Sequence, residues 1–584
     1  MNRLIKLMFE RRGYELDYYD KISKCGHDIP DNIETMCDVL KRYHDLHEHI
    51  TLLTDFDMDG IMSGVIGFAG LAQLGFDVSL YMPDVTGGYG FHESDIDKIM
   101  DQYPNTKAIL TADVGITSYG GIDRGSQLGV EMLITDHHRP ELVLKNASVV
   151  VDPKIASDND NIFSDICGAS VLYYTLYRYA EKYDAANVPQ IHRLRVFAGI
   201  GTVSDNMPLI YENRGFVTDA VDICRFAYGG DDTAENVENV NSIEGCEVYR
   251  RAFLGLHVIM KAFKEIGKFG DPSTLHEDFF GFYVAPVFNS IKRLGADIRL
   301  AYNVFFGGYQ AALDSMEALF KLNEERKELV NEYFSMLTTV PQPWAPYVLM
   351  TNGSGGIRGL LAMNYVNLSH LPALVVGASD NGLSGSGRSP AWYPFADRMQ
   401  VANIDGLRVA GHNGAFGVFI RDEAVIDKLI AFLNKDLPKF RPEPNADGSY
   451  ESYDFTISYD GTGDCDLDIG DFIDFLDELE PLRPFGPAFE PPYILLRFPS
   501  KKTAWTFMGK SNEHVKVSLP CGLKIVCFNQ GDNFIPDGSN PEEGPKVDED
   551  SLPDVIEVAG SLSYNEYKGT RSVQFMGNFL NIRG

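Results

Sequence analysis

Cysteine is scarce in this sequence, and no two cysteines form a CxxC pair. The eight that are present are scattered between Cys25 and Cys527. Structural zinc sites and disulfide-rich folds need cysteines at close, regular spacings. The pattern therefore excludes those frameworks and favours reduced thiols, as in a cytoplasmic protein.

Long apolar runs are also missing. The most apolar helical segment, residues 61–76, is short and rich in glycine for a membrane span. The first residues of the chain begin a helix, but no apolar stretch of the kind found in secretory signals follows them. We therefore expect no membrane segment and a cytoplasmic location.

Basic residues are outnumbered by acidic ones. The chain has 51 Lys and Arg against 83 Asp and Glu, a formal net charge of −32 and a pI near 4.7. A protein that coats nucleic acid through its overall field is basic, so that class is disfavoured. Much of the acid lies in residues 443–480 and 532–554, so a local basic groove elsewhere remains compatible with the composition. At 584 residues the chain is long enough for several globular domains.

Three carboxylates follow a short apolar run that predicts a buried strand. They are Asp55, Asp57 and Asp59, at alternate positions. Carboxylates spaced in this way after a strand share one space, where a hard divalent cation holds them together. A solvated turn is the simpler alternative. An EF-hand loop is excluded, because it needs Glu at its twelfth position, which is Ile66 here.

Two further apolar runs end at similar residues. One ends at Asp113, and the other ends at Asp136, followed by His137 and His138. A predicted helix later in the chain leads to Asp205. In parallel α/β sheets ligands gather beyond the carboxyl ends of the strands. These side chains are therefore expected to converge, although each taken alone is equally typical of a surface loop or a helix cap.

The segments DFDMDG, ADVG, DHH and GTVSD, in this order, resemble the four motifs of the DHH phosphoesterases. The later chain resembles the RecJ exonucleases within that group, at residues 285–293, 322–327 and 482–487. The resemblance covers nearly the whole chain. It implies two divalent cations, Mn²⁺ or Mg²⁺, which together activate a water and stabilise the charge of a displacement at phosphorus.

The resemblance also implies roles for individual residues. The implied metal ligands are Asp55, Asp57, Asp59, Asp113, His137 and Asp205. Asp57 and Asp59 would each face one metal, and Asp113 would bridge the two. The implied catalytic residues are Asp113, Asp136 and His138. Asp136 would accept a hydrogen bond from an imidazole N–H and so fix that ring for its metal, and His138 would face the scissile phosphate.

Some positions depart from the family pattern. Leu53 stands where many DHH relatives have a histidine, and Asp55 would supply the missing ligand. Val287 stands where an arginine is expected, residues 83–90 lack another, and Ser354 replaces a histidine. The missing arginines leave the nuclease chemistry intact but affect how a 5′ end is held.

The order of patterns predicts a multidomain α/β protein. Strands and helices alternate over residues 51–228, as in a doubly wound parallel sheet, and five short strands after residue 492 fit an OB barrel. We predict an N-terminal cap and DHH catalytic domain (residues 1–230), a helical connector (231–340), a DHHA1 α/β substrate-binding domain (341–440), an acidic linker (441–480) and an OB-fold β-barrel that binds nucleic acid (481–584).

Two glycine-rich stretches are predicted to be loops that approach the substrate. Residues 385–389 predict a turn whose glycines admit a phosphate and whose Arg388 offers a planar fork of donors. Residues 409–415 form the second stretch. An ordinary loop with a surface arginine is the alternative. The residues expected to bind substrate are His138, Asn289, Arg293, Ser386, Arg388 and His412.

These features lead to one main hypothesis, a metal-dependent exonuclease that degrades single-stranded DNA in the 5′-to-3′ direction to 5′-mononucleotides, in DNA repair and recombination. One alternative is a DHH phosphodiesterase acting on short oligoribonucleotides or cyclic dinucleotides, which needs no OB barrel. Another is a non-catalytic RecJ-like replication scaffold, which would lack the carboxylates present here. We expect a monomer, with a single-strand-binding protein or replication and recombination proteins as candidate partners.

Overall fold

The computed structural model divides into two compact units. The larger unit comprises Ile22–Pro438 with Gly486–Phe489, and the smaller unit comprises Met1–Lys21, Lys439–Phe485 and Glu490–Gly584. The structure describes residues 2–25, 32–84, 90–140, 142–155, 165–228, 243–337, 347–379, 382–443, 452–466, 468–501, 503–509, 512–528, 530–531, 547, 552–567 and 570–580.

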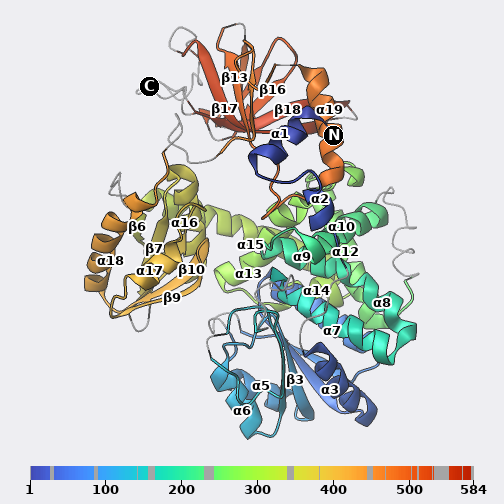
Figure 1. Cartoon of the computed structure of the whole chain (residues 1–584). Coiled ribbons are helices and arrows are strands. Elements are labelled where there is room, and N and C mark those ends of the chain that lie inside the picture. Colours follow the sequence, from blue (N-terminus) through green and yellow to red (C-terminus); the bar gives the residue numbers. More distant parts are fainter. Residues whose placement is uncertain are drawn as a thin grey trace. The chain divides into compact units, whose positions relative to one another are not determined.

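A parallel five-stranded sheet in the order β2-β1-β3-β4-β5 forms the first part of the larger unit (Figure 1). Its strands are β1 (His49–Thr54), β2 (Val78–Tyr81), β3 (Thr106–Ala112), β4 (Glu131–Thr135) and β5 (Val149–Val151). Successive residues point into different cores: Leu52 and Leu110 lie in one hydrophobic cluster, and Leu53 and Ile109 lie in another. Both faces are therefore covered, which confirms the predicted doubly wound sheet.

Helices supply the other side of each core. The cluster with Leu52 includes residues of α3 (Ile33–Leu46), α4 (Met58–Gln73) and α7 (Gly168–Tyr183). The cluster with Leu53 includes residues of α5 (Glu93–Gln102) and α6 (Tyr119–Gln127). Figure 1 shows α5 and α6 on one side of β3 and α3 on the other.

The chain then continues through helices, as predicted. They are η3 (Ala185–Asn187), α8 (Val188–Arg193), α9 (Arg195–Ser204), α10 (Tyr211–Tyr228), α12 (Glu247–Glu265), η4 (Pro272–Thr274), the π-helical η5 (Phe280–Val284), α13 (Ala285–Leu294), α14 (Arg299–Phe306) and α15 (Tyr309–Met336). Met316 and Leu319 of α15 are buried in the same core as α4. The apolar stripe of this long helix therefore faces the core.

A second, mixed sheet follows in the order β6-β7-β8-β10-β9. Its elements are β6 (Tyr347–Met350), α16 (Gly355–Ser369), β7 (Ala373–Ser379), β8 (Gly382–Arg388), α17 (Phe395–Val401), β9 (Leu407–His412), β10 (Ala415–Ile420), α18 (Glu423–Asp436) and η6 (Leu437–Lys439).

The prediction of a glycine-rich turn at residues 385–389 is wrong. Its first residues, up to Arg388, belong to β8, the central strand of this sheet, which pairs with β7 and β10. The glycines permit close packing within the sheet, since a Cβ on Gly387 would lie 2.1 Å from the Phe416 ring. Residues 409–415 form the β9–β10 hairpin and are likewise mostly strand.

The smaller unit is built on an eight-stranded sheet in the order β12-β11-β13-β17-β18-β16-β15-β14. Its elements are β11 (Phe455–Ser458), β12 (Cys465–Asp466), α19 (Ile469–Leu479), η7 (Glu480–Leu482), β13 (Ile494–Pro499), β14 (Ala504–Met508), β15 (His514–Ser518), β16 (Lys524–Cys527), β17 (Val555–Tyr567) and β18 (Thr570–Phe579). The five strands predicted from the sequence correspond to β13 and β15–β18.

The second half of the stretch predicted as an acidic linker, residues 441–480, forms strands and a helix. There β11 pairs with β13, and α19 buries Phe472, Phe475, Leu476 and Leu479. These apolar residues recur at helical spacing, and the acidic residues between them lie on the outer face of the helix.

The first residues of the chain also belong to the smaller unit. α1 (Arg3–Arg11) and all but the last residue of α2 (Tyr18–Ile22) lie in this unit. Beyond α1, Arg12 makes a bidentate ion pair with the buried Asp454, at 2.7 and 2.6 Å. Charge-assisted pairs of this geometry are strong and directional. This ion pair links the first residues of the chain to the residue that precedes β11.

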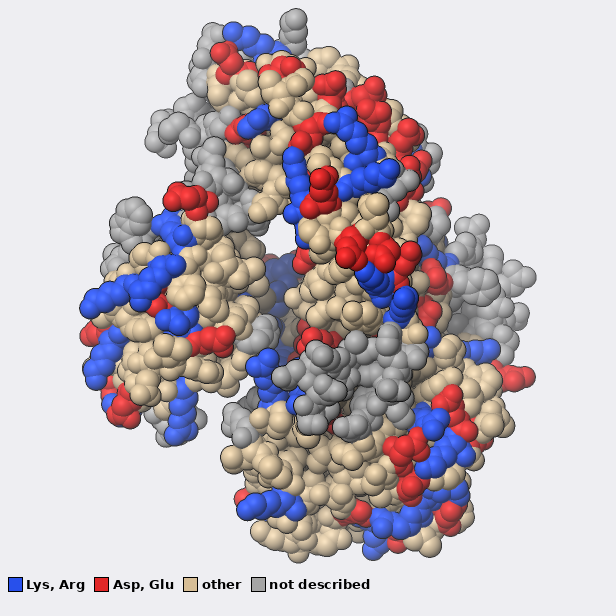
Figure 2. All heavy atoms as spheres, viewed as in Figure 1, with Lys and Arg blue, Asp and Glu red and all other residues tan. Residues whose placement is uncertain are grey.

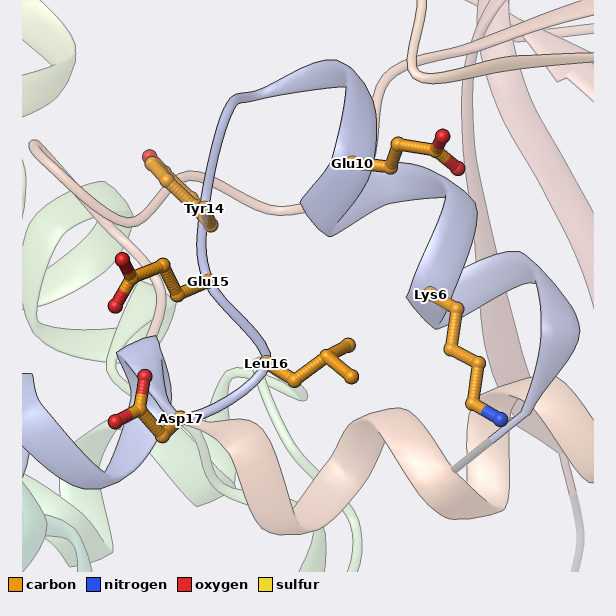
Figure 3. A pocket seen from close by; sticks show the side chains of 6 residues that line it. All are labelled: Lys6, Glu10, Tyr14, Glu15, Leu16 and Asp17. Carbon is orange, nitrogen blue, oxygen red and sulfur yellow. The ribbon is translucent and has the colours of Figure 1, made fainter.

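The surface agrees with the mixed composition. Figure 2 shows acidic and basic side chains interspersed over the face in view. A pocket beside α1 is lined by Lys6, Glu10, Tyr14, Glu15, Leu16 and Asp17 (Figure 3). None of the residues predicted to form the site lies in it. Among the helices that the structure describes, none has the length and apolar character needed to cross a bilayer.

Candidate metal centre

The predicted acidic residues meet at the carboxyl edge of the parallel sheet. Asp55, Asp113 and Asp136 directly follow β1, β3 and β4. The last residues of these three strands pair in register with one another. Neighbouring parallel strands thus end side by side, and carboxylates far apart in the sequence lie close together.

Helices bring further carboxylates to this edge. Asp57 is the N-cap of α4, and Asp205 is the C-cap of α9. Asp59 lies in the first turn of α4 and accepts hydrogen bonds from the backbone N–H groups of Gly168 (2.7 Å) and Ala169 (3.2 Å), at the start of α7. These bonds fix the Asp59 carboxylate against a helix N-terminus, which favours its negative charge.

His137 lies among the carboxylates. Its Nε2 atom is 3.1 Å from Oδ1 of Asp113, 3.6 Å from Oδ2 of Asp205 and 3.9 Å from Oδ2 of Asp59. Burial and the neighbouring charge of His138 lower the pKa of His137 to about 3. The ring is therefore neutral at physiological pH, which is the form that binds metal ions.

The side chains form three groups with the spacing of a metal site. Within each group the ligand atoms lie within 4.8 Å of one another. The first group is Asp59, His137 and Asp205, the second is Asp55, Asp57 and Asp113, and the third is Asp113, His137 and His138. The structure thus brings together every residue predicted to bind metal. Their function as ligands stays a prediction.

The carboxylates of this centre carry unbalanced charge. Burial and the charge of Asp57 raise the pKa of Asp59 to about 6, and burial and the nearby carboxylates raise that of Asp113 well above its usual range. The Oδ1 atoms of Asp55 and Asp113 are buried and have no hydrogen-bond partner. A hard cation would accept these oxygens and offset the repulsion, so the residues fit Mn²⁺ or Mg²⁺.

Close packing of the backbone holds this arrangement. A Cβ on Gly168 would lie 2.4 Å from Cβ of Asp113, and one on Gly201 would lie 2.4 Å from Oδ1 of Asp59. Asp113 itself has a φ of 62°, in the left-handed region that a residue with a side chain rarely adopts. Backbone strain of this kind is characteristic of functional sites.

Asp136 contacts the second of the two adjacent histidine rings. Its Oδ1 atom lies 2.8 Å from Nδ1 of His138, while Nδ1 of His137 has no hydrogen-bond partner. Asp136 thus contacts an imidazole as predicted, and the ring is that of His138 and not that of the predicted ligand His137. The backbone N–H groups of Ile116, His137 and His138 also donate to Asp136 and fix the carboxylate.

His138 is held as a cation by this contact. Burial opposes its charging, but the hydrogen bond and charge of Asp136 and the charges of Asp205 and Asp57 prevail and raise the pKa of His138 to about 9. The side chain remains 36% exposed, so a substrate can reach it. A protonated, accessible imidazole can donate to a phosphate oxygen.

The sequence reasoning missed Lys292, on α13. Its Nζ atom lies 3.1 Å from Oδ2 of Asp57 and 3.5 Å from Oδ2 of Asp55. Asn289, which precedes it by three residues, accepts a hydrogen bond from the backbone N–H of Met58 at 2.8 Å. Residues three apart share a helix face. The prediction that Asn289 contacts the substrate could therefore have pointed to Lys292, which lies on the same helix face.

The other residues predicted to bind substrate include two arginines. Arg388 is on β8 with Ser386, and burial together with the charge of Arg293 lowers the pKa of Arg388 to about 10. Arg293 of α13 donates to the carbonyl of Gly356, at 3.1 Å. Neither arginine has a carboxylate partner within the described part of the chain, so both guanidinium groups are available to an anion.

His412 is the remaining predicted residue of this set. It is the last residue of β9, and its side chain lies outside the described residues.

Comparison with known families agrees with this geometry. The family model for the DHH family, N-terminal domain, matches residues 49–200. The model for the RecJ OB domain matches residues 464–578. The chain thus contains a DHH N-terminal domain and a RecJ OB domain. The second match confirms an OB domain at the C-terminal end, and it begins inside the stretch predicted as a linker.

Curated relatives match most of the chain at low identity. This chain is 24% identical over 578 residues to the single-stranded-DNA-specific exonuclease RecJ of Bacillus subtilis, covering 96% of this chain and 64% of that protein. It is 23% identical over 586 residues to RecJ of Haemophilus influenzae, covering 94% of this chain and 90% of that protein. The chain thus spans less than two thirds of the Bacillus protein.

Solved structures show the same fold. RecJ from Thermus thermophilus in complex with Mn²⁺ aligns with a TM-score of 0.71 and 22% identity, covering 99% of this chain and 75% of that one. The same protein in complex with Mg²⁺ aligns with a TM-score of 0.67. These alignments confirm the predicted α/β multidomain fold, whereas the DHHA1 assignment of the second sheet stays a prediction.

Proposed function

We propose that this RecJ-like protein is a metal-dependent exonuclease that degrades single-stranded DNA in the 5′-to-3′ direction to 5′-mononucleotides. The observation that carries the proposal is the convergence of Asp59, Asp113, His137 and Asp205 around one space at the sheet edge. The curated relatives named as single-stranded-DNA-specific exonucleases support the same substrate.

The proposed cofactors are two divalent cations, Mn²⁺ or Mg²⁺. Asp59, His137 and Asp205 would hold one, Asp55 and Asp57 would hold the other, and Asp113 lies within reach of both groups. When bound, the cations would supply Lewis-acid stabilisation of charge at phosphorus and lower the pKa of a bound water. The Mn²⁺ and Mg²⁺ complexes of the Thermus protein support this choice.

His138 is the proposed proton donor. It is protonated at neutral pH through its bond to Asp136, and it is partly exposed beside the carboxylates. In this position it can donate to a non-bridging phosphate oxygen or to the leaving 3′-oxygen. General acids of this kind contribute roughly 10²–10⁴-fold to rate.

Binding of the strand is proposed to depend on local positive charge. Arg293 and Arg388 are the proposed phosphate contacts, with Ser386 and His412 beside Arg388 on the same sheet. A few such contacts are enough to hold one strand, so the net charge of −32 does not conflict with a DNA substrate. The OB domain would add a further single-strand contact.

The proposed setting is the cytoplasm, in DNA repair and recombination. All eight cysteines are free thiols, as a reducing compartment requires. The proposed form is a monomer that meets a single-strand-binding protein or other replication and recombination proteins on DNA.

The proposal is tested with single strands labelled at the 5′ or the 3′ end and incubated with Mn²⁺. The 5′ label should appear at once as mononucleotide, while the 3′ label stays in progressively shorter strands. Asp113→Ala should abolish cleavage, and Asp123→Ala, an exposed acid on α6, should not. Cleavage by Asp113→Ala at the wild-type rate would refute the site, and hydrolysis restricted to short oligoribonucleotides would favour the phosphodiesterase alternative.

A further inference from the structure

One corner of the metal centre, formed by Asp55 and Asp57, already contains a positive charge. The Lys292 ammonium lies 3.1 Å from Asp57 and 3.5 Å from Asp55, and it also lies 4.9 Å from the centre of the Phe56 ring. All three partners belong to the loop that follows β1. The Lys292 side chain is therefore directed at the Asp55–Asp57 side of the centre.

Lys292 is fixed in this position by the contacts of its helix. Asn289, on the same face of α13, accepts from the backbone of Met58 at the start of α4. At the other side of Lys292, Arg293 donates to the carbonyl of Gly356. Val287, Phe288 and Ile291 are buried and pack α13 against the core of the larger unit. The contact is thus part of the packed structure, not a chance position of a surface lysine.

Among the described residues, the other corner of the centre has no lysine or arginine paired with its carboxylates, although the charges of His138 and Lys154 act on Asp205. In the described part of the chain, no Lys or Arg forms an ion pair with Asp59, Asp113 or Asp205. Lys292 therefore gives the Asp55–Asp57 corner a paired cation that the other corner lacks.

We propose that Lys292 acts as a built-in cation that competes with a metal ion for Asp55 and Asp57, so that the two metal sites of this protein are unequal. The site at Asp59, His137 and Asp205 would fill first. The site at Asp55 and Asp57 would fill only at higher metal concentration, because the incoming ion must displace the ammonium or share the carboxylates with it. The inference rests on the proposed function only in assuming that this centre binds divalent metal.

The test is a titration of the metal-free full chain with Mn²⁺ alone. Isothermal calorimetry and the electron-paramagnetic-resonance signal of free Mn²⁺ together give the number of sites and their affinities. The wild type should show one tight site and a second one weaker by about tenfold or more, the size of effect that a close charge has on the proton affinity of a carboxylate. Lys292→Met should tighten the second site by about the same factor.

Two further variants separate charge from structure. Lys292→Arg keeps the positive charge and should keep the sites unequal. Lys261→Met removes a lysine that pairs with Glu265 and donates to Tyr309, away from the centre, and should leave the isotherm unchanged. Lys292→Gln provides a second neutral variant if the methionine variant does not fold.

Particular outcomes overturn the inference. Two Mn²⁺ sites of equal affinity in the wild type would do so without any variant, and so would a neutral variant with the wild-type isotherm. In both cases the nuclease proposal would stand. A wild type that binds no Mn²⁺ would overturn the inference and the proposed function together.

Discussion

Nδ1 of His138 lies 2.8 Å from Oδ1 of Asp136, and this contact keeps the ring charged. The pKa of His138 is raised to about 9, so a step that needs its proton should continue up to about that pH and fail above it. Without the carboxylate the pKa should fall towards about 6.5, the usual value for histidine.

Asp136→Asn should therefore shift the alkaline limb of the rate profile. At pH 8 the rate should drop by about thirtyfold, because only a few per cent of His138 would then remain protonated. The measurement is single-turnover cleavage of single-stranded DNA from pH 5.5 to 10. His138→Gln serves as the control, since it should lose the limb altogether. An Asp136→Asn profile that coincides with the wild type would contradict the role of His138.

Metal binding should stabilise the protein more at neutral pH than at acidic pH. Burial raises the pKa of both Asp55 and Asp59 to about 6 from 3.8. The stability that a raised carboxyl pKa contributes to the metal-free protein is fully present below about pH 4 and is lost as the pH rises through about 6. Mn²⁺ needs the deprotonated groups, so its effect should grow over the same window.

The measurement is the melting temperature with and without Mn²⁺ at pH 5, 6, 7 and 8. At pH 7, Mn²⁺ at a hundred times its Kd should add about 2.7 kcal/mol of stability. Asp113→Asn is the control: it should raise the melting temperature of the metal-free protein and reduce the metal effect. A metal effect that is constant across this pH range would count against the assignment.

Gly168→Ala should damage the centre through packing alone. The added Cβ would lie 2.4 Å from Cβ of Asp113, at a backbone that cannot easily move. Overpacking of this kind costs about 1–3 kcal/mol. Unfolding in urea and Mn²⁺ titration should show lower stability and weaker metal binding. Gly270→Ala is the matched control, because a Cβ there meets nothing within 4 Å, and equal losses in both variants would contradict the packing argument.

Arg388→Met should weaken DNA binding in a salt-dependent way. If Arg388 contacts one phosphate, its loss should reduce the slope of log K against log salt by about 0.7, the value for single strands. Fluorescence anisotropy of a labelled single strand, without added metal, measures both affinity and slope. Arg421→Met is the control, because Arg421 is exposed and paired with Asp405 and Asp422. An unchanged slope would exclude Arg388 as a phosphate contact.

The metal centre was predictable because its residues follow a strong local pattern. Asp55 and Asp113 each end an apolar run, and parallel strands bring such ends together whatever the sequence between them. The partner of Asp136 was not predictable in the same way. His137 and His138 are adjacent in the sequence, and only the backbone conformation after β4 decides which ring turns towards the carboxylate.

The second sheet and the smaller unit show where sequence patterns fail. β8 contains glycine and serine in place of alternating apolar residues, because close packing against Phe416 and the neighbouring strands leaves no room for larger side chains. The helix α19 was not predicted because its acidic composition is typical of a linker, although Phe472 and Phe475 occupy its buried face. Lys292 lies 235 residues from Asp57, and no local pattern connects them.

One short helix, α13, contacts both the carboxylates and α16, the helix that packs on the second sheet. Asn289 accepts a hydrogen bond from the first residue of α4, and Arg293 donates one to the first turn of α16. A DNA strand bound at Arg388 would therefore lie at a distance from the cleaving residues that α13 sets. The size of the piece removed in each cycle would then depend on the length of α13, and lengthening that helix should change the length of the released product.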